Sequence, residues 1–157
     1  MRGAKATHPA KYAELSDMKN FFSFALFVVM IFTFIVPSYA ENLRISVKAD
    51  GKTLTATLED NPASREFYSR LPLTLKMEDL YEREMCYNLE DALPTGKLVS
   101  DNYRVGDLIY WLPGKSLVIL YKQNGERFSR QYLGHIDSGV ELFEHTGDIE
   151  VTFDVLK

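Results

Sequence analysis

Arg130 and its aromatic neighbours form a pattern that could bind a ligand. Residues 128–136 are expected to form a strand, on which Arg130 shares one face with Phe128 and Tyr132. Gln131 then lies on the opposite face, so Arg130 and Gln131 do not share a pocket. Arg130 is therefore a candidate binding residue. A surface arginine packed along aromatic neighbours explains the same pattern without a ligand, and this explanation is favoured.

A second group of candidates consists of Tyr110, Trp111 and Tyr121. Tyrosine and tryptophan combine a large apolar area with a hydrogen-bonding tip, which suits the wall of a binding cleft. Tyr110 and Trp111 are adjacent, so both cannot face the interior of a regular strand, and one of them is expected to be partly exposed. Packing inside the domain is the alternative for each of the three, and it is favoured.

The histidines and nearby carboxylates give a weaker signal. His135 is kept as a candidate ligand contact. Glu141 and His145 lie four residues apart, which is compatible with a ligand pair but equally with an ordinary ion pair on a helix. A histidine in the last turn of a helix is also stabilised by the helix dipole, so the structural explanation is favoured for His145. We expect neither a metal nor a cofactor.

Two further features are better explained by structure than by chemistry. Glu59, Asp60 and Asn61 precede a predicted helix, where Asn61 can cap the free N–H groups and the dipole favours carboxylates. Cys86 is the only cysteine and lies within a predicted strand, so a buried small apolar residue is a better interpretation than a reactive thiol. The sequence contains no nucleophile elbow and no glycine loop of the phosphate-binding type.

Residues 18–40 have the three parts of a secretory signal peptide. Lys19 supplies the positive charge, residues 21–36 are apolar and uncharged, and Ser38 and Ala40 are the small residues of a cleavage site. We expect cleavage after Ala40 and export to the periplasm or the exterior of a bacterial cell. An uncleaved anchor is the alternative, although the apolar run is shorter than the roughly 20 residues that usually span a membrane.

Residues 1–17 are polar and lack apolar periodicity, so we expect a non-native or extended N-terminus with translation starting at Met18. The whole chain has 18 basic and 22 acidic residues, of which residues 1–40 hold four and two, so residues 41–157 have 14 and 20 and a net charge of −6. Such an acidic domain without a basic run does not favour nucleic-acid binding. A membrane contact is expected only through the signal segment, if that segment is uncleaved.

Residues 41–157 are enough for one domain with a single core. Alternating or continuous apolar runs predict about eight strands and two short helices, and Asp50-Gly51 predicts a type I′ turn. The expected strands are 43–49, 52–58, 73–77, 83–88, 105–111, 116–121, 128–136 and 149–155, and the expected helices are 63–71 and 140–145. Residues 89–103 are expected to form an irregular loop. Short strands with glycine and proline turns favour a closed barrel or a sandwich.

Five segments together resemble the bacterial cyclophilin-like domain family. They are Thr57-Leu-Glu-Asp-Asn-Pro-Ala63, Leu71-Pro-Leu-Thr-Leu75, Gly106-Asp-Leu-Ile-Tyr-Trp111, Leu117-Val-Ile-Leu-Tyr121 and Leu133-Gly-His-Ile-Asp-Ser-Gly139. Where this group often carries arginine, the chain has His135, which does not supply the permanent charge of an arginine. The resemblance implies an all-β domain: a closed eight-stranded cyclophilin-like barrel with short helices over its ends.

The resemblance implies a fold and carries no activity with it. True cyclophilin isomerases have a Phe-Met-x-Gln-Gly-Gly-Asp segment, which is absent here. We therefore expect an exported, non-catalytic module that binds a peptide or a small ligand, of unknown identity, through Tyr110, Trp111, Tyr121 and Arg130. The alternative is a divergent peptidyl-prolyl cis/trans isomerase centred on Arg130.

Overall fold

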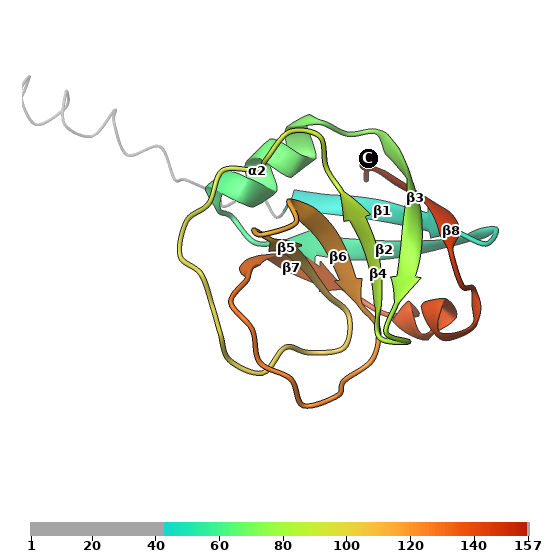
Figure 1. Ribbon diagram of the computed structural model, residues 1–157. Helices are drawn as coiled ribbons and strands as arrows, with labels where there is room; N and C mark the ends of the chain where they lie inside the picture. The colour runs from blue at the N-terminus through green and yellow to red at the C-terminus, as the bar shows by residue number, and fades with distance from the viewer. Residues whose placement is uncertain (1–42, 157) are drawn as a thin grey trace, which may run out of the picture. The chain divides into compact units, whose positions relative to one another are not determined.

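Eight antiparallel strands close into a barrel in the computed structural model, which describes residues 43–156 (Figure 1). The strands are β1 (Leu43–Ala49), β2 (Lys52–Leu58), β3 (Leu73–Leu80), β4 (Glu84–Asn88), β5 (Asp107–Trp111), β6 (Ser116–Leu120), β7 (Gln131–Ile136) and β8 (Ile149–Val155). Their order around the barrel is β1-β2-β7-β5-β6-β4-β3-β8. The predicted closed eight-stranded barrel is confirmed.

The hairpin of β1 and β2 forms as the sequence predicts. Asp50 and Gly51 both have positive φ angles, 47° and 69°, as a type I′ turn requires. Alternation along β1 sends Ile45 and Val47 into the barrel. One edge of the hairpin pairs with β8 and the other with β7, so it closes the barrel.

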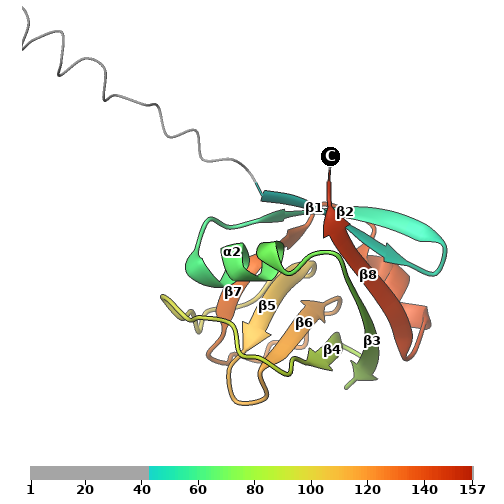
Figure 2. The same ribbon diagram turned by 90° about the horizontal axis from the view of Figure 1, so that it is seen from above.

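Two short helices accompany the strands. Helix α2 (Pro62–Ser69) begins after Asn61, whose side-chain oxygen accepts a hydrogen bond from the Ser64 N–H at 2.9 Å, so the predicted cap is confirmed. The helix lies beside β7 and ends two residues before the predicted Leu71, because a residue that precedes proline disfavours helical angles (Figure 2). The predicted turn at Val140–His145 is the 3-10 helix η1.

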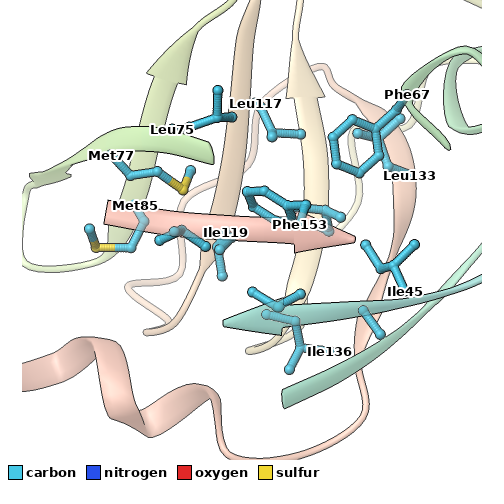
Figure 3. Close-up of a cluster of buried hydrophobic side chains, with 14 of the residues drawn as sticks. Ile45, Phe67, Leu75, Met77, Met85, Leu117, Ile119, Leu133, Ile136 and Phe153 are labelled. Atoms are coloured by element: carbon cyan, nitrogen blue, oxygen red, sulfur yellow. The ribbon is translucent and has the colours of Figure 1, made fainter. Parts of the chain in front are cut away.

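The barrel interior is a continuous apolar core (Figure 3). Phe67 of α2 packs edge-to-face on Phe153 of β8, with ring centroids 5.5 Å apart. The other labelled core side chains come from five strands: Ile45, Leu75, Met77, Met85, Leu117, Ile119, Leu133 and Ile136. Burial of these side chains is the main force that holds the barrel together.

A second, smaller apolar cluster lies outside the barrel, on β5 and β6. Ile109, Val118 and Leu120 point outward and pack with Tyr103, against Phe128. Tyr103 and Phe128 belong to two loops, residues 89–106 and 121–130, which run side by side (Figure 1). β6 is therefore buried along its whole length, as its continuous apolar run predicted.

Some predicted boundaries were wrong. β7 begins at Gln131 rather than Phe128, because Arg130 pairs only with Val99 in an isolated bridge to the 89–106 loop. β3 extends three residues further, to Leu80, since it pairs with both β4 and β8. The irregular loop predicted at 89–103 is confirmed apart from that bridge.

The predictions for residues 1–17 and 18–40 lie outside the described residues. Among residues 43–156, no helix is long and apolar enough to cross a membrane.

Candidate ligand-binding groove

A groove of about 790 Å³ lies on the outer face of β3, β4, β6 and β5. We call it the outer groove and define it by six of its lining residues: Glu78, Arg83, Cys86, Trp111, Val118 and Phe128. Its floor follows from strand alternation, since Glu84, Cys86 and Asn88 of β4 and Ser116 and Val118 of β6 line it. Phe128 and Glu126, from the 121–130 loop, also line the groove.

Arg83 lies at one end of the outer groove, between carboxylates and aromatic rings. Its Nε and Nη2 groups donate to Oε2 of Glu84, at 3.0 and 2.5 Å. Its Nη1 group donates to the carboxylate of Glu126, which is 43 residues away in sequence. The guanidinium also lies over the rings of Tyr81 and Phe128, at 5.6 and 5.7 Å from their centroids. Arg83 is thus held in place from several sides.

The charges at this end depend on one another. Burial raises the pKa of Glu84, although the neighbouring Arg83 opposes the shift. Glu126 is exposed, and the hydrogen bond from Arg83 lowers its pKa. A hydrogen bond from Asn124 lowers it further, by a smaller amount. Burial alone would lower the pKa of Arg83, but the Glu84 and Glu126 carboxylates outweigh burial and raise it. The cluster therefore contains one cation and a buried and an exposed carboxylate.

Trp111 lies at the other end of the outer groove. It pairs with Ser116, which also pairs with Asn88, whereas Leu120 pairs with Glu84 beside Arg83. Four residues of strand therefore separate the two ends, a distance of about 13 Å. Trp111 is 40% exposed as a whole residue, and it is the only tryptophan in the chain. Its emission can therefore report on the groove without a label.

Cys86 lies on the groove floor between these ends, opposite Glu78 of β3. Its side chain is partly buried rather than fully buried as the sequence suggested, because it faces the groove and not the barrel interior. Burial raises the pKa of the thiol, an effect that the hydrogen bond with Ser116 partly offsets. The thiol is therefore protonated at neutral pH and is a weak nucleophile there.

Comparison with known proteins identifies the fold family. Residues 47–154 match the sequence model of the Cyclophilin-like family. The chain belongs to this family. A hypothetical protein of Archaeoglobus fulgidus, whose structure was solved in solution, has the same fold as this cyclophilin-like chain, with a TM-score of 0.59 and 15% sequence identity. The match covers 77% of this chain and 100% of the archaeal one. No curated protein matches the sequence.

The three predicted aromatic residues of the cyclophilin-like domain separate in the structure. Trp111 lines the outer groove, and Tyr110 points into the barrel core, where it is 2% exposed. This is the split that adjacent strand residues require. Tyr121 is also buried, and its hydroxyl donates to Oδ1 of Asp79 at 2.5 Å. Burial, together with the Asp79 carboxylate, raises the Tyr121 pKa.

Arg130 is neither at the surface nor among the groove-lining residues. The whole residue is 2% exposed, and its guanidinium donates to the carbonyl and the carboxylate of Asp101, both at 2.9 Å. Neighbouring Gln131 accepts a hydrogen bond from the Gly96 N–H at 2.7 Å. Arg130 and Gln131 point to opposite faces of the chain. Arg130 thus holds the 89–106 loop at Asp101, and Gln131 holds it at Gly96.

His135 lies on another part of the barrel surface. Its Nδ1 is 3.0 Å from Oδ1 of Asp107 on the neighbouring strand β5, and Nε of Arg104 is 3.5 Å from the same oxygen. The structure therefore does not bring Tyr110, Trp111, Tyr121, Arg130 and His135 together, and of these five only Trp111 lines the outer groove.

Sequence reasoning missed the residues at the Arg83 end. Arg83 and Glu84 resemble an ordinary polar corner between two strands, and Glu126 follows an Asn-Gly turn. The uninterrupted apolar run of β6 was a usable signal, because it indicates that something covers the outer face of the sheet. That cover includes Phe128, which also lines the groove.

Proposed function

We propose that this cyclophilin-like domain is a non-catalytic module that binds a peptide or a small ligand in the outer groove. The observation that carries the proposal is the groove itself, with a volume of about 790 Å³. Its lining joins apolar and aromatic side chains, among them Trp111, Val118 and Phe128, to a few polar groups. Ligand sites in proteins commonly have this volume and this composition.

The alternative function is a divergent peptidyl-prolyl isomerase centred on Arg130. The position of Arg130 does not favour it, since a buried guanidinium that is bonded to Asp101 is not available to a substrate. Arg83 lines the groove but already donates to Glu84 and Glu126. These contacts support a ligand-binding role over prolyl isomerisation.

Chemical-shift mapping by NMR with a pool of N-acetylated tetrapeptides tests the proposal. We expect the perturbed backbone amides to concentrate at Cys86, Trp111 and Val118. Perturbations elsewhere, or none with any peptide, would contradict it. In parallel, the purified protein should not accelerate cis/trans isomerisation of a proline-containing tetrapeptide. Acceleration above the uncatalysed rate would support the isomerase alternative.

We further propose that the domain works outside the cytoplasm of a bacterial cell, after export and cleavage. The support for this proposal is the pattern of residues 18–40, with a lysine, an uncharged apolar run and small residues before the expected cleavage site.

A further inference from the structure

The two carboxylates bound to Arg83 differ in how firmly the fold holds them. The Glu84 side chain is 10% exposed and belongs to strand β4, so it stays beside Arg83 while the barrel is folded. The Glu126 side chain is 58% exposed and belongs to the 121–130 loop. Only the Glu126 side of this ion pair is exposed, so its carboxylate regains water when it leaves Arg83, while Arg83 keeps the Glu84 carboxylate as a partner. Glu84 is the permanent partner and Glu126 an exchangeable one.

A ligand carboxylate can take the place of Glu126 on Arg83 without changing the net charge of the cluster. Arg83 and Glu84 together are neutral, so the Glu126 carboxylate is the excess charge of the cluster. A guanidinium has five N–H donors, and among the described residues Glu84 and Glu126 accept three of them. The Nη1 side of Arg83 can therefore take both oxygens of another carboxylate when Glu126 moves away.

We propose that Glu126 stands in for a ligand carboxylate, and that the groove takes the C-terminal end of a short apolar peptide whose carboxylate replaces Glu126 on Arg83. This inference rests on the proposed function of the groove. It adds the chemical class of the ligand and an internal competitor for its site.

The length and lining of the groove favour a peptide over a small acid. About 13 Å, or four residues of extended chain, separate the level of Glu84 from the level of Trp111. An extended peptide of four residues spans this distance with its carboxylate at Arg83. Cys86 and Val118 offer it an apolar floor. At the far end it meets the Trp111 ring and Ser116.

The test compares one N-acetylated tetrapeptide with a C-terminal leucine, as the free acid and as the amide. Calorimetry with the purified protein gives the affinities, and Trp111 emission confirms where the peptides bind. We expect the acid to bind at least about tenfold more tightly, because it forms charge-assisted hydrogen bonds with Arg83. In Glu126→Gln the acid should bind about fivefold more tightly than to the wild type, and the amide should bind as before.

Asp60→Asn is the matched control, because it removes an exposed carboxylate that pairs with an arginine, Arg65, and neither residue lines the groove. It should change the affinity for the acid by much less than Glu126→Gln. Glu126 is at the surface, so its variant is expected to fold.

Three results would overturn the inference. Equal affinity of acid and amide, with a change in Trp111 emission, would remove the carboxylate preference but leave groove binding intact. Binding of 3-phenylpropionate as tight as that of the acid would remove the assignment to a peptide end. Absence of binding by both peptides would overturn the inference, and absence of binding by the wider tetrapeptide pool would contradict the proposed function as well.

Discussion

Arg83 contributes to stability and to the candidate site at once, because a buried carboxylate depends on it. Without Arg83, Glu84 keeps its buried position but loses the cation that compensates its charge. The importance of Arg83 was not predictable from the sequence, since its second partner, Glu126, is brought to it only by the closed barrel and the 121–130 loop. Asn61, by contrast, was predictable because a helix cap depends only on neighbours in sequence.

Arg83→Met is predicted to lower the free energy of unfolding by about 3–5 kcal/mol at neutral pH. The loss should grow as the pH rises. Burial already keeps the pKa of Glu84 in the folded chain above its unfolded value of 4.5, and Arg83 opposes this shift. Without Arg83 the folded-state pKa should lie higher still, so the variant should lose more stability than the wild type as the pH rises above 4.5. Chemical denaturation between pH 4 and 8 measures both effects.

Arg65→Met is the control for this variant, because the Arg65–Asp60 ion pair is exposed on both sides. It should leave the denaturation midpoint unchanged. If the two variants lost equal stability, Arg83 would have no special structural role.

The Cys86 thiol is predicted to react slowly with iodoacetamide at pH 7, and its rate should still increase above pH 9. Burial raises its pKa above the ordinary value of 9.0, so the thiolate forms only in more alkaline solution. Mass spectrometry of the whole protein measures the rate, since Cys86 is the only cysteine. A rate that levels off below pH 9 would show that the thiol is activated instead.

Strands were predictable where one face is buried and the other is exposed to solvent, as in β1 and β2. The start of β7 was not predictable. Phe128 and Arg130 keep the alternation of the strand, but they belong to the loop that packs outside the barrel. The groove was not predictable either, since its walls come from strands and a loop that are far apart in sequence.

Gly134→Ala is predicted to destabilise the pairing of β7 with β2 by about 1–3 kcal/mol. A Cβ atom at Gly134 would lie 2.4 Å from the Thr57 carbonyl oxygen and 2.8 Å from the Leu58 Cα, both of which are backbone atoms. Thermal denaturation measures the effect. Gly96→Ala is the control, because its nearest neighbour would be 3.7 Å away, and it should stay within about 0.5 kcal/mol of the wild type. Equal midpoints for both variants would contradict the close approach of β2 and β7.

At the scale of the whole molecule, the chain combines a predicted export signal with a barrel that carries a groove on its outer face. The barrel was predictable as a fold because each short strand carries its own pattern and the five segments resemble one family. The ligand was not predictable, because a fold does not determine what its surface binds.

The exported protein is predicted to begin at Glu41. Mass spectrometry of its N-terminal peptide, after purification from the envelope or the medium of the native host, tests this cleavage site. Cleavage after Ala40 leaves strand β1, which starts at Leu43, complete. If the exported protein still contained residues 18–40, the result would support an uncleaved anchor instead. A precursor peptide covering Ala6 to Tyr12 would contradict translation from Met18.

Protection of Cys86 by a bound peptide tests directly whether the outer groove is the binding site. Cys86 lies on the groove floor, so a peptide that occupies the groove must cover it. The alkylation rate of Cys86 is measured at pH 9 with increasing concentrations of the free-acid tetrapeptide, whose binding is followed by calorimetry. We expect the rate to fall in proportion to the occupied fraction of the protein. An unchanged rate at saturation would show that the peptide binds elsewhere and would contradict the assignment of the outer groove as the binding site.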